Sequence, residues 1–283
     1  MARGGAVRFA RSQTSKGKTM DGARTIWRAA RMPLLYRNFP TAYRNRAMSY
    51  AKGGQSEVAY RFWNGTVVHG TDGREEVRII NEIWGDRCYA APGFVPAPGW
   101  TVVDIGANKG IFALWALHQA RHDLRLVCYE PSPRSFSYLE RNIRRSVPDD
   151  MLHNAAVGAV AGDVTLYELV GRSGQSSLIQ SKAKAAAFRN KIVETIVPRV
   201  ALSDVLAEFG PVDLLKVDAE GAEYEILADS PTEALSEVRR IVMEYDAIDS
   251  RDSSRNADDL FRVLATGGFS VREKDDHIAF LSR

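Results

Sequence analysis

Apolar residues beyond position 100 recur with two alternating periods. Strand-length apolar runs occur at TVVDI (101–105), LRLVCYE (124–130) and VDLLKVD (212–218), and segments with helical spacing separate them. We expect further strands at 151–157 and 239–246, and helices at 109–120, 133–145, 203–208, 221–229 and 256–266. This alternation predicts an α/β fold, in which a mostly parallel, doubly wound sheet is covered by helices on both faces.

Two segments depart from the alternation. The runs DVTLYELV (163–170) and KIVETIVPRV (191–200) are β-like. The polar stretch 171–191 between them is predicted either as a lid or acceptor-binding element, or as a surface loop without contact to the substrate. At the end of the chain, FSVREK (269–274) and HIAFLS (277–282) predict a hairpin. We expect this hairpin to put one antiparallel strand at the edge of the sheet.

The first hundred residues carry different signals. In 58–80, Asn64-Gly65 and Asp72-Gly73 separate short β-type runs and predict an antiparallel hairpin element. Residues 81–100 are rich in Pro, Gly and aromatic side chains and are expected to form an ordered approach segment. We therefore divide the chain into a basic, helical N-terminal extension (1–57), a hairpin and approach segment (58–100), and a cofactor-binding α/β domain (101–283).

A helix is expected within 23–39 of the extension. Helical spacing places one set of apolar residues on a common face, although Pro33 is expected to kink or end the helix. That face comprises Ile26, Trp27, Ala30, Leu34 and Leu35. It is expected to pack on the rest of the chain or on a second copy, which would make a homo-oligomer.

Composition indicates a globular protein of the cytoplasm. The chain has 283 residues, of which 45% are hydrophobic, and no apolar run approaches the roughly 18 residues of a membrane span. The basic start lacks the apolar stretch of a secretory signal. The two cysteines, Cys88 and Cys128, lack metal-ligand spacing and are expected to be reduced thiols.

Charge is distributed unevenly along the sequence. Residues 1–50 contain eleven Lys or Arg and one acid, Asp21, so their net charge is +10; the net charge of the whole chain is +3, which leaves −7 for residues 51–283. A basic leader of this kind is found in transit peptides, in arms that bind RNA or a membrane surface, and in solvated helical extensions.

The stretch DIGANKG (104–110) joins a strand to a helix through a glycine turn. A dinucleotide site requires a second glycine where Asn108 stands, so the fit to NAD is poor. The pattern D-x-G-x-(G/N)-x-G instead resembles the first motif of class I S-adenosylmethionine (SAM)-dependent methyltransferases. Gly106 and Gly110, with Ala107 and Asn108 between them, would approach the amino-acid part of the cofactor, and Asp104 would hold the turn or reach its ammonium group.

An acid ends the second strand of the α/β region. Glu130 lies 24 residues after Gly106, where a carboxylate can accept two hydrogen bonds from a ribose diol. Neighbouring residues are expected to border the adenine, and we assign Pro131 and Ser132 to one edge and Asn154, Ala155 and Ala156 to the other.

A second group of polar residues follows the strand at 212–218. Lys216, Asp218 and Glu220 in LLKVDAEGAEYEIL, and Glu244 at the end of the next strand, lie where α/β sheets place ligands. Asp218 or Glu220 is the expected general base, and Lys216 would tune a carboxylate or stabilise an alkoxide. The rim of Asp218, Glu220 and Glu244 could alternatively chelate Mg²⁺.

Two histidines are further candidates for the general base. His153 is expected to be structural, because it lies beside the strand end that borders the adenine. His69 is expected to be exposed in the hairpin.

Four blocks in order, DIGANKG, YEPSPRSFSYLERNI, QSSL and LKVDAEGAEYEIL, closely resemble the FkbM family of SAM-dependent methyltransferases. The resemblance covers roughly residues 80–250, and EIWGDRCY (82–89) is also similar, whereas the basic leader lies outside it. It implies a class I, Rossmann-like fold, SAM as cofactor, and methyl transfer to a hydroxyl group of a small molecule such as a polyketide, another natural product or a sugar.

Other functions stay open at this stage. An RNA methyltransferase would use the basic arm to bind phosphates, but the sequence shows no recognition module with interleaved aromatics, which argues against nucleic acid. Methyltransferases that act on amino groups usually carry Asn/Asp-Pro-Pro-Tyr/Phe, from which KVDAEG departs. An NAD-linked oxidoreductase is disfavoured because a Tyr-x-x-x-Lys pair is absent, and a SAM-binding scaffold without turnover is the alternative outside enzymes.

Overall fold

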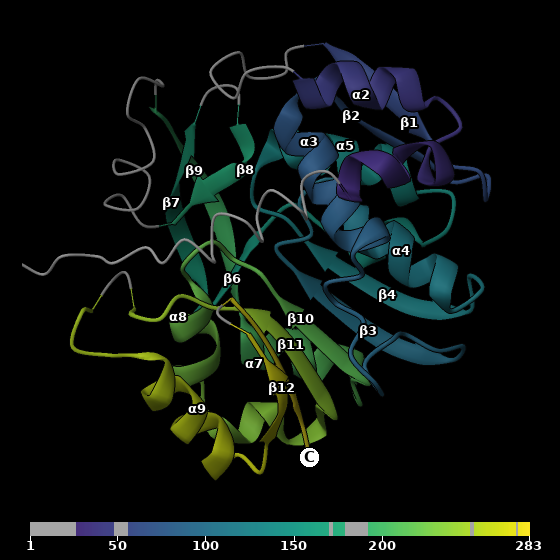
Figure 1. Cartoon of the computed structure of the whole chain (residues 1–283). Helices are drawn as coiled ribbons and strands as arrows, with labels where there is room; N and C mark the ends of the chain where they lie inside the picture. The colour runs from purple at the N-terminus through teal and green to yellow at the C-terminus, as the bar shows by residue number, and fades with distance from the viewer. Residues whose placement is uncertain (1–26, 48–55, 170–171, 179–191, 250–251, 276) are drawn as a thin grey trace, which may run out of the picture.

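A computed structural model describes residues 27–47, 56–169, 172–178, 192–249, 252–275 and 277–283 of the chain. Its centre is a seven-stranded sheet with the order β12-β13-β11-β10-β3-β4-β5 (Figure 1). The strands are β3 (Trp100–Ile105), β4 (Leu124–Tyr129), β5 (Leu152–His153), β10 (Leu214–Val217), β11 (Arg240–Glu244), β12 (Ser270–Lys274) and β13 (Ile278–Ser282). β3, β4, β5, β10 and β11 pair in parallel, as the sequence predicts.

Alternate side chains of the central strands enter two separate hydrophobic clusters. Val102 of β3 and Leu126 of β4 belong to one cluster, whereas their neighbours Val103 and Val127 belong to the other. Successive residues of a strand point to opposite faces, so each cluster marks one face of the sheet. α4 (Ile111–Gln119) and α5 (Pro133–Ile143) contribute to the first cluster. α7 (Leu202–Phe209), α8 (Glu223–Ala228) and α9 (Ala257–Thr266) contribute to the second, so the expected doubly wound α/β fold is confirmed.

The antiparallel strand does not lie at the edge of the sheet, where we expected it. β13 is antiparallel to both β11 and β12 and lies between them, and β12 forms the edge. The reason is a difference in hydrophobicity between the two strands of the hairpin. Four of the five β13 residues are buried, whereas every residue of β12 is exposed, so the apolar strand takes the inner place.

The strand expected at 151–157 is divided in two. β5 ends at His153, and β6 (Ala156–Gly158) belongs to a second sheet of order β6-β9-β7-β8, visible on the left in Figure 1. The β-like runs form β7 (Gly162–Leu169) and β9 (Ile192–Ala201), which pair antiparallel. Of the expected lid, only 172–178 are described; they include β8 (Arg172–Ser177), and residues 179–191 lie outside the described part.

The hairpin around Asn64-Gly65 is confirmed, because β1 (Glu57–Arg61) pairs antiparallel with β2 (Val67–Thr71). After Asp72-Gly73, however, the expected β-type run is the helix α3 (Arg74–Ile80), which continues into a π-helical turn, Asn81–Gly85. Two features explain the helix. Glu75 and Glu76 lie in the first turn, where the helix dipole favours acids, and Val77 and Ile80 are buried with helical spacing.

Near the N-terminus, residues 27–35 are helical and α2 (Phe39–Ala47) follows. The expected apolar face was wrong: Trp27 and Leu34 are 56% and 78% exposed, whereas Met32 and Tyr36 are fully buried. Pro33 does not end the helix at its own position. Proline cannot donate to the carbonyl of residue 29, and the hydroxyl of Tyr43 donates to that oxygen instead, at 2.7 Å.

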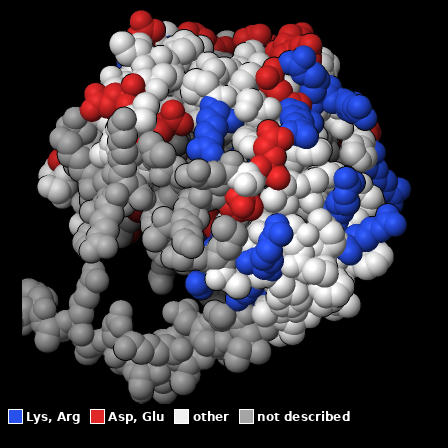
Figure 2. Space-filling model, turned by 90° about the horizontal axis from the view of Figure 1, so that it is seen from above, with Lys and Arg blue, Asp and Glu red and all other residues white. Residues whose placement is uncertain are grey.

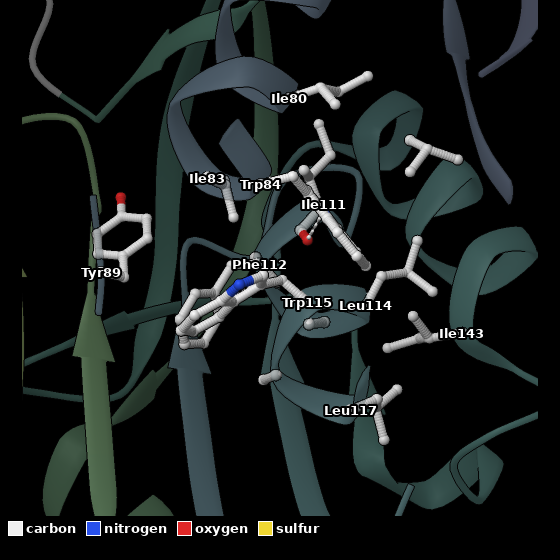
Figure 3. Close-up of a cluster of buried hydrophobic side chains, with 14 of the residues drawn as sticks. Ile80, Ile83, Trp84, Tyr89, Ile111, Phe112, Leu114, Trp115, Leu117 and Ile143 are labelled. Carbon is white, nitrogen blue, oxygen red and sulfur yellow. Dashed lines mark hydrogen bonds between the residues drawn. The ribbon is translucent and has the colours of Figure 1, made fainter. Parts of the chain in front are cut away.

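The segment before β3 shares its hydrophobic cluster with α4. Figure 3 shows Ile83 and Trp84 facing the start of α4, and the indole nitrogen of Trp84 donates to the carbonyl of Ile111 at 3.3 Å. This cluster contains residues from before position 57, from between 58 and 100, and from after position 100. The division of the chain at those two positions stays a prediction.

Some of the basic residues of the N-terminal segment pair with acids of the rest of the chain. Arg28 lies 2.5 Å from Asp86 and 3.4 Å from Glu82, and Arg31 lies 3.9 Å from Asp86. Lys and Arg side chains gather along the right-hand flank of the face seen in Figure 2. Among the described residues, no helix has the length and apolar character needed to cross a membrane.

Candidate active site

The glycine turn lies directly after β3 and passes against the end of β10. Gly106 has φ +74°, and a Cβ added there would lie 1.7 Å from the carbonyl oxygen of Asp218. The backbone nitrogens of Gly106 and Ala107 both donate to the carbonyl of Tyr129 at 3.0 Å. The turn therefore requires glycine at 106, and it joins the ends of β3, β4 and β10.

The second half of the turn leads into α4. Asn108 has φ +50°, a conformation that asparagine adopts more readily than most residues. Gly110 has φ +76°, and a Cβ there would lie 2.8 Å from Cδ1 of Leu139 in α5. Lys109, whose side chain was given no role from the sequence, is buried and forms an ion pair with Glu76 of α3.

Glu130 organises the loops at the end of β4. Its Oε2 accepts from the backbone nitrogen of Asn108 and its Oε1 from that of Ser132, both at 2.8 Å. Burial raises the pKa of Glu130 to about 7, and the two backbone donors oppose this effect. Each carboxylate oxygen has a second lone pair, so Glu130 can also accept two hydrogen bonds from a diol.

A first pocket, with about 610 Å³ of space including its open mouth, lies over these strand ends. It contains eight of the residues singled out from the sequence: Gly106, Asn108, Glu130, Pro131, Ala155, Ala156, Asp218 and Glu220. Leu166 and Leu178 add apolar surface. Asn108 lines this pocket, and its Oδ1 is buried without a hydrogen-bond partner among the described residues.

Four other predicted cofactor residues support the pocket without lining it. Oγ of Ser132 accepts from the backbone nitrogen of Ser135 and caps α5, and Nδ2 of Asn154 donates to the carbonyls of Glu130 and Pro131 at 2.8 and 3.1 Å. Gly110 and Asp104 are buried behind the turn. These residues hold the loops in place instead of contacting the space where a ligand fits.

Lys216 joins three segments beneath the turn. Its Nζ lies 2.9 Å from Oδ1 of Asp104, 3.1 Å from the carbonyl of Gly106 and 3.6 Å from Oδ2 of Asp218. Burial alone would lower the pKa of Lys216. The carboxylates of Asp104 and Asp218 raise this pKa by more than burial lowers it, so the lysine is charged. Lys216 therefore holds the turn through the carbonyl of Gly106, and its positive charge lies beside the carboxylate of Asp218.

A second hollow continues from the first pocket past Gly106 and Asn108. It is lined by all four residues predicted to be catalytic, Lys216, Asp218, Glu220 and Glu244, and also by Tyr89. Asp218 and Glu220 line both hollows, so they lie at the junction between them. The structure thus brings together residues from the ends of β10 and β11.

Tyr89 is the site residue that the sequence prediction missed. Its hydroxyl lies 2.7 Å from Oε1 of Glu244 and 3.2 Å from Oδ2 of Asp218. Its ring meets that of Phe112 edge-on at 5.3 Å, and Figure 3 shows it at the strand side of the cluster. Tyr89 ends the EIWGDRCY block, which was the available signal, although nothing in the block specifies its partner.

The two carboxyl groups beside Tyr89 share an unusual electrostatic environment. The negative charge of Asp218, followed by burial, raises the pKa of Glu244 to about 8. Burial also raises the pKa of Tyr89, which therefore stays protonated and donates. A carboxyl group whose pKa is raised toward neutral pH is suited to act as a general base.

The histidines occupy other places. His153 stacks on Tyr129 with ring centroids 4.5 Å apart, in agreement with a structural role. His69 is half-buried, not exposed as expected, because Asn142 of α5 holds its backbone nitrogen at 2.7 Å and its backbone carbonyl at 2.9 Å. Within the described residues, no group of three or more His, Cys, Asp or Glu side chains could hold a metal ion, so the Mg²⁺ alternative gains no support.

Residues 104–273 match the family model described as "Methyltransferase FkbM domain". The chain is 27% identical over 240 residues to the 31-O-demethyl-FK506 methyltransferase FkbM of Streptomyces tacrolimicus, covering 76% of this chain and 90% of that protein. It is 28% identical over 245 residues to the AMB antimetabolite synthetase AmbE of Pseudomonas aeruginosa, covering 75% of this chain but only 11% of the synthetase.

A structure of methyltransferase FkbM from Methylobacillus flagellatus aligns with 93% of this chain and 59% of its own, at 13% identity and a TM-score of 0.42.

Proposed function

Because this chain belongs to the FkbM methyltransferase family, we propose that it is a SAM-dependent O-methyltransferase whose acceptor is a hydroxyl group of a small molecule. The observation that carries the proposal is the carboxyl pair of Asp218 and Glu244, bridged by the Tyr89 hydroxyl beside the glycine turn. A hydroxyl acceptor loses a proton when it attacks a methyl group, so it benefits from a base that is poised near neutral pH.

The first pocket fits the cofactor that the family uses. Bound SAM would supply an electrophilic methyl group on a positively charged sulfur. Glu130 offers its two carboxylate oxygens to the ribose diol, and Pro131 and Ala155 offer apolar surface to the adenine. Gly106 lets the backbone approach the amino-acid part, and the unpartnered Oδ1 of Asn108 suits an ammonium donor.

The residues of the second hollow would then have distinct tasks. Glu244 would accept the proton of the attacking hydroxyl, and Asp218 would keep the pKa of Glu244 high enough for it to do so. Tyr89 would orient both carboxyl groups, and Lys216 would hold the turn from below. Such a base contributes roughly 10² to 10⁴-fold. Holding the two reactants together contributes about 7 to 11 kcal/mol, so positioning is the larger part of the task.

The similarity to the Streptomyces tacrolimicus protein supports the small-molecule hydroxyl acceptor. Its name describes methylation of an oxygen of FK506, and this chain spans 90% of its length. The synthetase is a weaker guide, because the chain spans 11% of it.

The test combines binding with turnover. Calorimetry with SAM should give one binding site per chain, and tritium from methyl-labelled SAM should appear in hydroxylated acceptors from a panel of glycosides, cyclic diols and macrolide alcohols. Glu244→Gln should bind SAM as the wild type does and transfer methyl groups at least about 100-fold more slowly. SAM binding without transfer to any member of the panel would instead favour a non-catalytic SAM-binding protein.

A further inference from the structure

A third hollow opens beyond the second one. It has about 1220 Å³ of space including its mouth, and it shares Arg78, Glu82, Cys88 and Glu244 with the second hollow. Among the described residues, those that line it are Trp27, Arg28, Arg78, Glu82, Asp86, Cys88, Glu244, Asp275, His277 and Ile278. Glu244 therefore lies at the boundary, with the cofactor side on one hand and this larger space on the other.

This hollow is built almost wholly outside the segment that matches the family model. The match covers residues 104–273, and of the ten lining residues only Glu244 falls within it. One wall comes from helix 27–35, α3 and the turn after it, and the other from the β12–β13 connection. The segment that matches the family model thus contributes Glu244, whereas the other described residues of the third hollow lie in the sequence on either side of that segment.

The charged groups of the wall are paired with one another. Arg28 lies 2.5 Å from Asp86 and 3.4 Å from Glu82, and Arg78 lies 2.6 Å from Glu82. Among the described residues of the lining there are therefore two guanidinium groups and four carboxyl groups, counting Glu244 and Asp275. An anionic acceptor would have to compete with these carboxylates for the arginines, whereas an uncharged acceptor can hydrogen-bond to the paired groups without separating them.

Trp27 gives the wall an apolar surface. Its side chain is 56% exposed, and the guanidinium group of Arg31 lies 4.1 Å from the centre of its ring, which holds the ring in place. An exposed indole that lines the same hollow as these paired guanidinium and carboxylate groups matches a ring that has one C–H face and several hydroxyls. The C–H face stacks on the indole and the hydroxyls bond to the charged array.

We infer that the third hollow is the acceptor site and that it selects an uncharged, polyhydroxylated ring, such as a glycoside or a cyclic polyol. Trp27 and the Arg28–Glu82–Asp86 group set this specificity, and Glu244 receives the hydroxyl at the inner end. The inference rests on the proposed function for the chemistry at Glu244, but the binding part stands apart from it.

The experiment measures ligand binding to the full chain saturated with S-adenosylhomocysteine. The probes are methyl α-D-glucopyranoside, its 6-phosphate, its uronic acid and trans-cyclohexane-1,2-diol. Saturation-transfer NMR and calorimetry measure their binding. The neutral probes should bind at least about tenfold more tightly than the anionic ones. Trp27→Ala should weaken binding of the neutral glucoside about tenfold. Glu82→Gln frees part of the arginine charge and should strengthen binding of the 6-phosphate.

Trp63→Ala is the matched control, because Trp63 is 60% exposed and does not line the hollow. It should leave all four affinities unchanged, and S-adenosylhomocysteine binding should be equal in every variant, which shows that they are folded. Failure of every neutral probe to bind, preference for the anionic probes, or equal affinity in Trp27→Ala would overturn the inference.

The two proposals fail in different ways. Selective binding of neutral probes without methyl transfer to any hydroxyl acceptor would leave the acceptor site standing and remove the proposed reaction. Methyl transfer with a KM for the acceptor that Trp27→Ala does not change would keep the reaction and remove the acceptor site.

Discussion

The hydroxyl group of Tyr89 lies 2.7 Å from Oε1 of Glu244 and 3.2 Å from Oδ2 of Asp218, so one phenol bridges the ends of two adjacent strands. A phenol has a single proton and donates it to one carboxylate at a time. Its donation to Glu244 lowers the pKa of that group, while the charge of Asp218 raises it. The proton affinity of the site is thus set by contacts among side chains from three segments.

Tyr89→Phe should slow the reaction without loosening the cofactor. The ring can still pack on Phe112, but the donor to Glu244 is lost, so the pKa of Glu244 rises. One hydrogen bond to a charged group corresponds to about one pKa unit, and we expect kcat at pH 7 to fall about tenfold. Steady-state kinetics and SAM calorimetry measure the two effects.

Tyr224→Phe is the matched control for this substitution. The hydroxyl of Tyr224 donates to the backbone carbonyl of Asp246 at 2.9 Å, and Tyr224 lines none of the three hollows. Its kcat should equal that of the wild type. A Tyr89→Phe enzyme with wild-type kcat would show that Tyr89 takes no part in the reaction.

The pH dependence of kcat/KM should report Glu244. The base acts in its deprotonated form, so activity should rise as pH increases through about 8, the raised pKa of Glu244. Asp218→Asn removes the negative charge that is the largest cause of this shift, so the rise should move to lower pH. A profile between pH 6 and 10 that is the same in both proteins would exclude this coupling.

Glycine at 106 should be essential to cofactor binding. Gly106→Ala places a Cβ 1.7 Å from the carbonyl of Asp218, so the ends of β3 and β10 must separate. We expect SAM affinity to be lost or kcat to fall about 100-fold, as a displacement of about 1 Å can cause. Calorimetry and turnover measure this.

Gly99→Ala separates the clash from backbone strain. Gly99 has φ +79°, close to that of Gly106, but nothing lies within 4 Å of its added Cβ. Its only cost should be the left-handed conformation, about 1 to 2 kcal/mol of unfolding free energy. Equal SAM affinities in the two alanine variants would mean that the contact with Asp218 does not matter.

Lys216→Met should destabilise the protein. The substitution leaves the fully buried Asp104 without its partner, which lies 2.9 Å away in the native protein. Removing one member of a buried pair typically costs about 3 to 5 kcal/mol of unfolding free energy. Arg239→Ala breaks a pair in which the arginine is 66% exposed, and it should cost no more than about 1 kcal/mol. Urea denaturation of both variants tests the difference.

SAM affinity should depend on the charge of Glu130. Burial raises its pKa to about 7, so protonation below that pH removes acceptors for the ribose diol and affinity should decrease as pH falls. Glu130→Gln should weaken SAM binding about 10 to 100-fold and abolish this pH dependence. Glu140→Gln, in the exposed pair with Arg144 on α5, should leave both unchanged.

Several features of the fold and site were predictable because their signals are local. The buried parallel strands are apolar runs bounded by turn residues. Gly106 marks the end of its strand in the sequence, because the turn there has a positive φ that favours glycine. Glu130 was predictable because it directly follows β4, the strand that pairs with β3. The acid and the glycine turn therefore lie at the same end of two neighbouring strands. The antiparallel hairpin at Asn64-Gly65 was equally local.

Other features depend on contacts between residues that are distant in the chain. Tyr89 is 129 residues from Asp218 and 155 from Glu244, and no spacing rule links them. The inner position of β13 and the edge position of β12 depend on which of the two strands packs against apolar neighbours. The helical conformation of 74–80 depends on the packing of Val77 and Ile80 in the cluster with α4.

The sequence by itself determined the α/β alternation, the family and the glycine turn after the first central strand, because each depends on residues within one or two elements of one another. Tertiary structure alone decided which carboxylates meet, which tyrosine joins them and which segments line the third hollow. The physical reason is that pKa values and hydrogen bonds depend on distances of a few ångströms between side chains, and only the packed sheet brings those side chains together.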